Sequence, residues 1–136
     1  MSSTSTTVNT SQIWKAALAA IVVSVIGNLV VRAIALALFQ IPAEFEPFGI
    51  PRIAFLTIIG VIAAALVFAW VARGAGDPYA RFRKIAIIAL ILSYLPDVAL
   101  VVGGIPGATW SGAFSLMVMH TWTAIVTVTL FERMTR

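Results

Sequence analysis

The chain of 136 residues has no cysteine, a single histidine and few charged side chains, which make up 10% of the sequence. Without cysteine it cannot form disulfides, thiolate nucleophiles, iron–sulfur clusters or cysteine-ligated zinc sites. A single histidine excludes histidine-rich metal sites. We therefore expect neither a metal nor another cofactor. The scarcity of charge also argues against a soluble domain, in which about a quarter of the residues are charged.

Apolar residues are abundant, at 61% of the chain. A soluble domain of this size leaves a large part of its surface exposed and could not bury so much apolar area. Disordered chains are polar and highly charged, so disorder is excluded by the same composition. The sequence predicts an integral membrane protein in contact with the lipid bilayer.

Four apolar runs are each long enough to cross a hydrocarbon core, which takes about 20 helical residues. They predict an all-α bundle of four transmembrane helices, at residues 16–39, 53–72, 85–103 and 113–131. Residues 1–12 are rich in Ser and Thr and contain no charged side chain. This segment has nothing to bury, and we expect a disordered cytoplasmic tail before a single domain at residues 13–136.

Basic residues are distributed unequally between the two ends of the predicted helices. Seven fall on the side of the two chain ends and the second connector, namely Lys15, Arg73, Arg81, Arg83, Lys84, Arg133 and Arg136. The other side has Arg52, and Arg32 if that residue reaches the interface. The excess of Lys and Arg marks the cytoplasmic side. We expect both termini in the cytoplasm and the chain in the inner (cytoplasmic) cell membrane as a multi-pass protein.

The formal net charge of +4 does not indicate nucleic-acid binding. Nucleic acid requires a solvated basic patch, and these basic residues lie at helix ends. No nucleic-acid partner is expected.

Ionisable and amide side chains inside the runs are the candidate functional residues: Asn28, Arg32, Asp97 and His120. At ~1.5 Å per residue, Asn28, Asp97 and His120 all fall about 18–20 Å from the charged residues that mark the cytoplasmic helix ends. Gly60 falls at the same level. Arg32 lies one turn beyond Asn28 on the same helix face. A buried guanidinium needs a carboxylate, and Arg32 could reach back to Asp97 or outward to Glu44 and Glu46. We expect the pair with Asp97, which equally needs a partner, and His120 nearby.

Pro96 directly precedes Asp97 and frees the carbonyl of Leu92 from helical hydrogen bonding. One interpretation is a kink that opens space beside the acidic residue, as discontinuous helices do in transporters. The other is a tolerated membrane proline whose freed carbonyl is satisfied by Ser93 or by water.

Three short segments carry a resemblance to a known group of proteins: Asn28-Leu29-Val30-Val31, Ser93–Asp97 and Met119-His120. In these segments the chain resembles small bacterial four-span membrane proteins catalogued as a domain of unknown function. The resemblance implies the four-helix architecture and a recurring histidine in the last span. It implies no catalytic residue.

These residues support two hypotheses about function. In the first, a polar pocket open to the outer face binds or moves a small ligand, with Arg32 supplying charge, Asp97 balancing it, Asn28 orienting the ligand and His120 sensing or relaying a proton. In the second, the polar layer is structural and the chain is an accessory or assembly subunit, as a homo-oligomer or with a membrane-complex partner. An intramembrane enzyme ranks third, since no nucleophile is evident.

Overall fold

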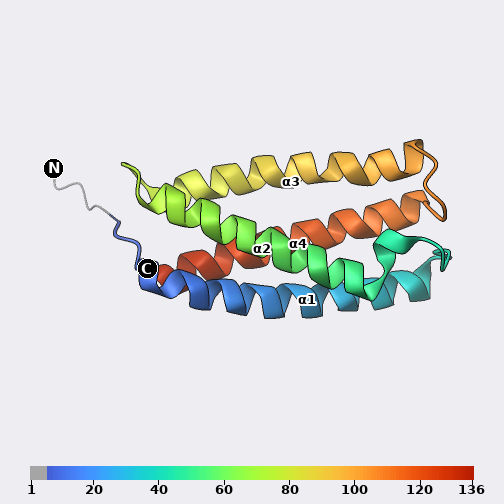
Figure 1. The fold of residues 1–136 in the computed structure, drawn as a ribbon, viewed down its shortest axis with the longest axis horizontal. Coiled ribbons are helices and arrows are strands. Elements are labelled where there is room, and N and C mark those ends of the chain that lie inside the picture. Colours follow the sequence, from blue (N-terminus) through green and yellow to red (C-terminus); the bar gives the residue numbers. More distant parts are fainter. Residues whose placement is uncertain (1–5) are drawn as a thin grey trace.

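In the computed structural model, which describes residues 6–136, four long helices run alternately in opposite directions (Figure 1). They are α1 (Ile13–Leu38), α2 (Ile50–Ala72), α3 (Pro78–Val102) and α4 (Trp110–Thr135). All four are long and apolar enough to cross a membrane, and the described residues contain no strand. The prediction of an all-α, four-helix membrane bundle is confirmed.

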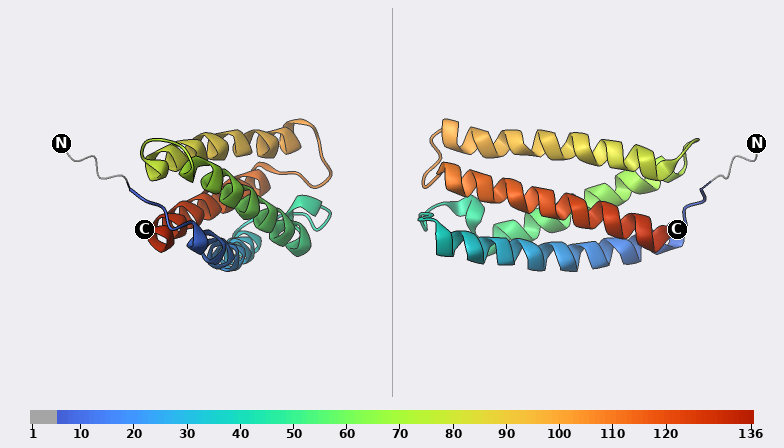
Figure 2. Two further views of the ribbon diagram at one scale, coloured as in Figure 1. Left: turned by 60° about the vertical axis from the view of Figure 1, so that its left-hand side comes forward. Right: turned by 180° about the vertical axis from the view of Figure 1, so that it is seen from behind.

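Three of the helices form a layer and the fourth crosses it. Seen from behind, α4 lies between α1 and α3, and α2 runs obliquely across the other face of this layer (Figures 1 and 2). The first part of α2 lies near α1 and its last part lies near α3 (Figure 1). Contacts are most extensive between α1 and α4 and much sparser between α2 and either α3 or α4. The oblique course of α2 therefore separates it from α3 along part of their length.

Helices α3 and α4 begin before their apolar runs because polar residues cap their first turns. The Asp77 carboxylate accepts hydrogen bonds from the backbone N–H groups of Tyr79 (2.9 Å) and Ala80 (3.3 Å), so α3 begins before its apolar run. The Thr109 hydroxyl likewise accepts from Gly112 N at 3.1 Å, at the start of α4. Such caps satisfy backbone donors that have no partner within the helix.

The segment that we expected to be a disordered tail is partly structured. Thr10–Gln12 form a turn of 3-10 helix, and the N–H of Asn9 donates to the carbonyl of Thr135 at 2.8 Å. Val8 also packs against the buried residues at this end of the bundle. The expectation was wrong for these residues because α4 offers them a backbone acceptor and an apolar surface. The first five residues of the predicted tail lie outside the described residues.

Buried apolar side chains form two clusters, one towards each end of the bundle. The terminal cluster lies at the end where the chain termini are found and is built around aromatic rings: Phe68, Tyr79, Phe82 and Phe131, with Ile13, Ala16, Ala20, Val61 and Val126. The centroid of the Phe68 ring lies 4.9 Å from that of Phe82 and 5.6 Å from that of Phe131. The connector cluster at the opposite end consists of Ala35, Phe45, Phe48, Ile53, Leu116 and Met119.

The α1–α2 and α3–α4 connectors, at the end opposite the termini, pack closely against each other. Phe45, in the α1–α2 connector, is only 2% exposed. Gly107, in the α3–α4 connector, has φ +77° and lies so close that a Cβ there would be 2.7 Å from Phe45 N. A glycine is required at Gly107 both by its backbone conformation and by this close approach.

Candidate functional site

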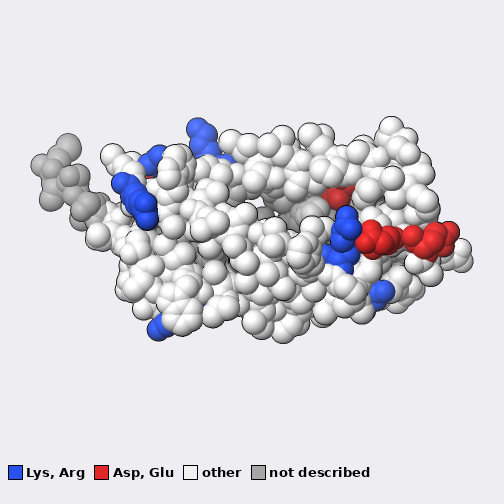
Figure 3. Space-filling view, in the orientation of Figure 1, with Lys and Arg blue, Asp and Glu red and all other residues white. Residues whose placement is uncertain are grey.

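A cavity of about 340 Å³ lies between the two apolar clusters. Its walls come mainly from α2, α3 and α4, and Asn28 of α1 and Pro47 of the first connector complete them. Several of the wall residues on α2 and α3 are exposed, namely Leu56, Gly60, Ala63 and Ala89. The cavity therefore opens sideways between α2 and α3, where Figure 3 shows a hollow in the surface.

Gly60 keeps part of this cavity open. A Cβ built at Gly60 would meet nothing within 4 Å. The sequence placed Gly60 at the level of Asn28, and both residues line the cavity. A Cβ at this position would therefore project from the cavity wall without a steric clash.

Asn28 joins three helices at one wall of the cavity. Its Nδ2 atom donates to Thr57 Oγ1 on α2 at 2.9 Å and to Thr123 Oγ1 on α4 at 3.0 Å. The Thr57 hydroxyl donates its own proton to the carbonyl of Ile53 at 2.7 Å, so it can only accept from Asn28. This fixes the orientation of the Asn28 amide and turns Oδ1 away from Thr57.

Two buried polar atoms on the cavity wall have no hydrogen-bond partner among residues 6–136. They are Asn28 Oδ1 and Thr127 Oγ1, and their residues are only 2% and 4% exposed. Buried polar groups are nearly always hydrogen-bonded, because leaving one unpaired costs about 1–3 kcal/mol. An amide oxygen can only accept a hydrogen bond. Asn28 Oδ1 would therefore be satisfied by a hydrogen-bond donor on a molecule inside the cavity.

Asp97 on α3 pairs with His120 on α4. His120 Nε2 lies 3.2 Å from Asp97 Oδ2 and 3.4 Å from Oδ1, and the geometry of a hydrogen bond is met at Oδ1. The Asp97 side chain is 6% exposed, whereas that of His120 is 39% exposed and lines the cavity. His120 thus connects a buried carboxylate to the cavity. A proton on Nε2 would serve this contact in both the neutral tautomer and the charged form.

The expected Arg32–Asp97 pair is not formed. Arg32 Nε donates to the carbonyl of Phe48 at 2.8 Å, and its Cζ lies 5.9 Å from the centroid of the Phe48 ring. The expectation was wrong because α4 lies between α1, which carries Arg32, and α3, which carries Asp97 (Figure 2). Arg32 instead lines a second hollow, of about 520 Å³, beside the α1–α2 connector.

Pro96 lies within α3, which is continuous from Pro78 to Val102. The Ser93 hydroxyl donates to the carbonyl of Leu90 at 2.5 Å, rather than to that of Leu92 as one interpretation proposed. Pro96 is exposed on the surface of the bundle, and Asp97 beside it is buried. The proline does not itself line the cavity.

Sequence reasoning missed two residues that contribute to this polar layer. Thr57 accepts from Asn28, and the Tyr94 hydroxyl lies 2.6 Å from Thr121 Oγ1, linking α3 to α4. Thr57 is the one polar side chain in the apolar part of α2, and that isolation was the signal available. Tyr94 carried no comparable signal, because its ring is compatible with a lipid-facing or a buried position.

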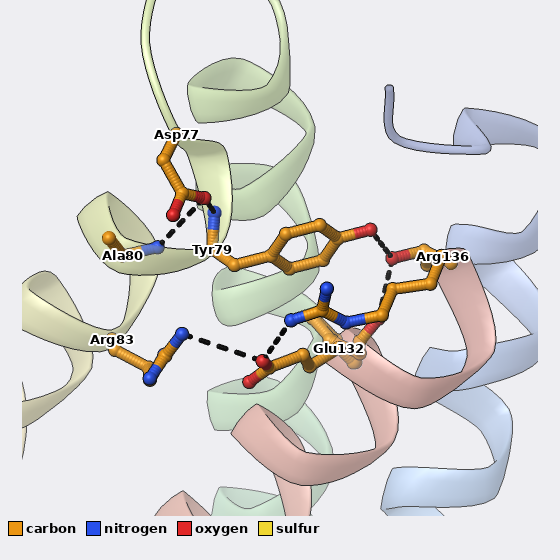
Figure 4. A network of polar contacts seen from close by, with 8 residues as sticks. Asp77, Tyr79, Ala80, Arg83, Glu132 and Arg136 are labelled. Atoms are coloured by element: carbon orange, nitrogen blue, oxygen red, sulfur yellow. Dashed lines mark hydrogen bonds and ion pairs between the residues drawn. The ribbon is translucent and has the colours of Figure 1, made fainter. Parts of the chain in front are cut away.

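A separate network of polar contacts holds the end where the termini lie (Figure 4). Glu132 on α4 accepts from Arg83 on α3 at 3.4 Å and from Arg136. The guanidinium of Arg136 also lies over the ring of Tyr79, with Cζ 4.7 Å from the centroid, and the Tyr79 hydroxyl lies 3.0 Å from Thr135 Oγ1. The hydrogen bond to Glu132 raises the pKa of the Arg136 guanidinium. This network stabilises the helix ends and has no contact with the cavity.

Comparison with known proteins extends the resemblance noted in the sequence. Residues 4–136 match a family described as a family of unknown function, DUF6069. No curated protein and no solved structure matches the chain. The resemblance to four-span membrane proteins of unknown function is confirmed by the family match and the four apolar helices.

Proposed function

We propose that this chain, which belongs to the family of unknown function DUF6069, is a membrane protein that binds a small ligand inside its bundle. The observation that carries the proposal is the cavity of about 340 Å³ with two buried, unpartnered polar atoms on its wall. Ligand pockets typically have volumes of about 300–1,000 Å³ and combine apolar walls with a few polar groups.

The chemistry of the wall limits what the ligand can be. Asn28 Oδ1 accepts only, and the rest of the wall is mostly apolar. The basic side chain that we had assigned to the pocket, Arg32, does not line it. An anion is therefore a poor fit. The ligand that fits is a largely apolar molecule with a hydroxyl, phenol or amine group, entering from the bilayer between α2 and α3.

Native mass spectrometry of the detergent-purified protein tests this function. We expect an added mass that is released on activation and is reduced or absent in Gly60→Leu, where the leucine side chain would occupy part of the cavity. The matched control is Ala33→Leu, which adds the same side chain on an exposed part of α1 outside both hollows. Equal retention of the added mass by Gly60→Leu and the wild type would place it outside the cavity and contradict the proposal.

A weak ligand could be lost on purification, so a probe of known structure completes the test. We would compare 1-octanol with 1-chlorooctane by saturation-transfer NMR, taking the difference between wild type and Gly60→Leu to remove the micelle background. The alcohol should give the larger difference because it can donate to Asn28 Oδ1. Equal signals from both probes would mean that water, and not a ligand, satisfies that oxygen.

We also propose an orientation and a membrane for the chain. The seven basic residues at the terminal end support a cytoplasmic location for both termini, in the inner cell membrane. The absence of native cysteine allows a direct test with a membrane-impermeant maleimide on intact cells. We expect Pro106→Cys in the α3–α4 connector to react and Ala75→Cys in the α2–α3 connector to react only after permeabilisation. The reverse result would invert the topology.

A second candidate function is that of an accessory or assembly subunit. The observation in its favour is that Asn28 ties α1, α2 and α4 together through its two hydrogen bonds, as a structural clasp would. In that case Gly60→Leu would leave function in the cell intact, and purification in mild detergent would retain a partner or a homo-oligomer.

A further inference from the structure

The hollow beside the α1–α2 connector is chemically unlike the central cavity. It has a volume of about 520 Å³ and is lined by two basic and two acidic residues, Arg32, Arg52, Glu44 and Glu46. On the face shown in Figure 3, acidic side chains gather at this end of the bundle, beside basic ones. Within the hollow, Arg52 and Glu46 neutralise each other through a contact of 3.1 Å between Nη1 and Oε1.

Arg32 and Glu44 remain as a cation and an anion that are not paired with each other. The Arg32 guanidinium is held in place by two contacts with Phe48, through Nε and through the ring face. Both contacts leave the two Nη groups available, and across residues 6–136 no carboxylate lies within 4 Å of them. A half-buried guanidinium oriented in this way can donate hydrogen bonds from its two Nη groups to an anion.

The depth of Arg32 indicates where that anion comes from. Arg32 lies 17 residues after Lys15 along the uninterrupted α1 helix, which is about 26 Å at ~1.5 Å per residue. A hydrocarbon core is about 30 Å thick. With Lys15 at one boundary, Arg32 lies near the other, at the level where phospholipids carry their phosphate groups. Arginine binds phosphate through paired hydrogen bonds.

We propose that this hollow binds the headgroup of a zwitterionic phospholipid with a primary ammonium group, such as phosphatidylethanolamine. The phosphate would accept hydrogen bonds from the Arg32 Nη groups, and the ammonium would donate to the Glu44 carboxylate on the rim. A choline headgroup has no N–H to donate, and a glycerol headgroup has no cation. The site is separate from the central cavity and does not depend on the ligand proposed there.

The test is native mass spectrometry of the full chain titrated with phosphatidylethanolamine, phosphatidylcholine and phosphatidylglycerol of identical acyl chains. We expect the ethanolamine lipid to bind best. Arg32→Gln should lower its binding by about tenfold or more, as expected for a lost charge-assisted contact. Glu44→Gln should abolish the preference over phosphatidylcholine. The control is Arg73→Gln, which removes an exposed basic residue at the opposite end of the bundle.

Three outcomes would overturn the proposal. The first is equal binding of the three lipids to the wild type, and the second is an unchanged affinity in Arg32→Gln. The third is equally strong binding of inorganic phosphate or phosphoethanolamine, which would show that a soluble phosphate and not a lipid is the ligand. If Arg32→Gln does not fold, the test rests on Glu44→Gln, because Glu44 is exposed and its loss leaves the packing unchanged. An unchanged preference of Glu44→Gln for phosphatidylethanolamine over phosphatidylcholine would then overturn the proposal. None of these outcomes bears on the central cavity.

Discussion

The terminal cluster and the polar layer show two ways in which the same four helices meet. In the terminal cluster, aromatic rings from α2, α3 and α4 pack against one another, and Phe68 and Phe131 are completely buried. In the polar layer, single hydrogen bonds join the helices around an open cavity. The difference indicates that close packing near one end supports the bundle while the middle is left free for polar groups and empty volume.

The largest effect is expected from breaking the terminal cluster. Phe68→Ala should lower the free energy of unfolding by about 3–5 kcal/mol, because it removes a buried ring that contacts three others. The measurement is reversible unfolding in mixed micelles with increasing SDS. Phe55→Ala is the matched control on the same helix, since Phe55 is 61% exposed. Similar losses in the two variants would show that this end is not the stable part of the bundle.

A smaller effect is expected from separating Asp97 and His120 in the polar layer. His120→Leu should destabilise the protein by about 2 kcal/mol, because Asp97 is left buried without its partner. The cost is below that of a fully buried pair because the His120 side chain is 39% exposed. The double variant Asp97→Leu/His120→Leu should recover most of the loss. Additive losses in the same unfolding assay would mean that the two residues do not stabilise each other.

The smallest of the three effects is expected at Asn28. Asn28→Ala removes two interhelical hydrogen bonds, which within membranes contribute about 0.6 kcal/mol each on average, so we expect a loss of about 1–2 kcal/mol. Ser24→Ala is the control, one turn earlier on α1, because the Ser24 hydroxyl is buried and has no partner in the described part of the chain. It should be nearly neutral in the unfolding assay. If Asn28→Ala cost as much as Phe68→Ala, the contrast between the two regions would not hold.

The fold could be predicted from the sequence because lipid imposes a simple rule on the backbone. Every backbone polar group in the membrane must be paired, so each apolar run of sufficient length becomes a helix. The helix ends were less predictable, since α3 begins at a cap, Asp77, that lies in a polar stretch. The structured turn at Thr10–Gln12 was missed because its support comes from α4, far away in the sequence.

The level of the candidate residues along their helices could be predicted from the sequence, but the side-chain contacts of Arg32 could not. The rise per residue gives the level of a side chain along a helix. Of the four residues placed at one level, Asn28, Gly60 and His120 line one cavity, whereas Asp97 does not and contacts it only through His120. The same reasoning paired Arg32 with Asp97, which was wrong. Which helices are neighbours depends on the order of α1, α4 and α3 in the layer, and the positions of polar residues along the chain do not encode that order.

The contact between Gly107 and Phe45 has a consequence for the order in which the protein can be completed during synthesis. Phe45 belongs to the first connector to be made, but Gly107 and Gly112, which cover its ring and backbone, belong to the last hairpin. Until that hairpin is inserted, the first connector lacks the part of its packing surface that Gly107, Gly112 and the buried residues of α4 supply. A nascent chain halted after α3 would therefore leave Phe45 partly uncovered, and exposed apolar surface of this kind makes incompletely folded chains targets of chaperones and proteases.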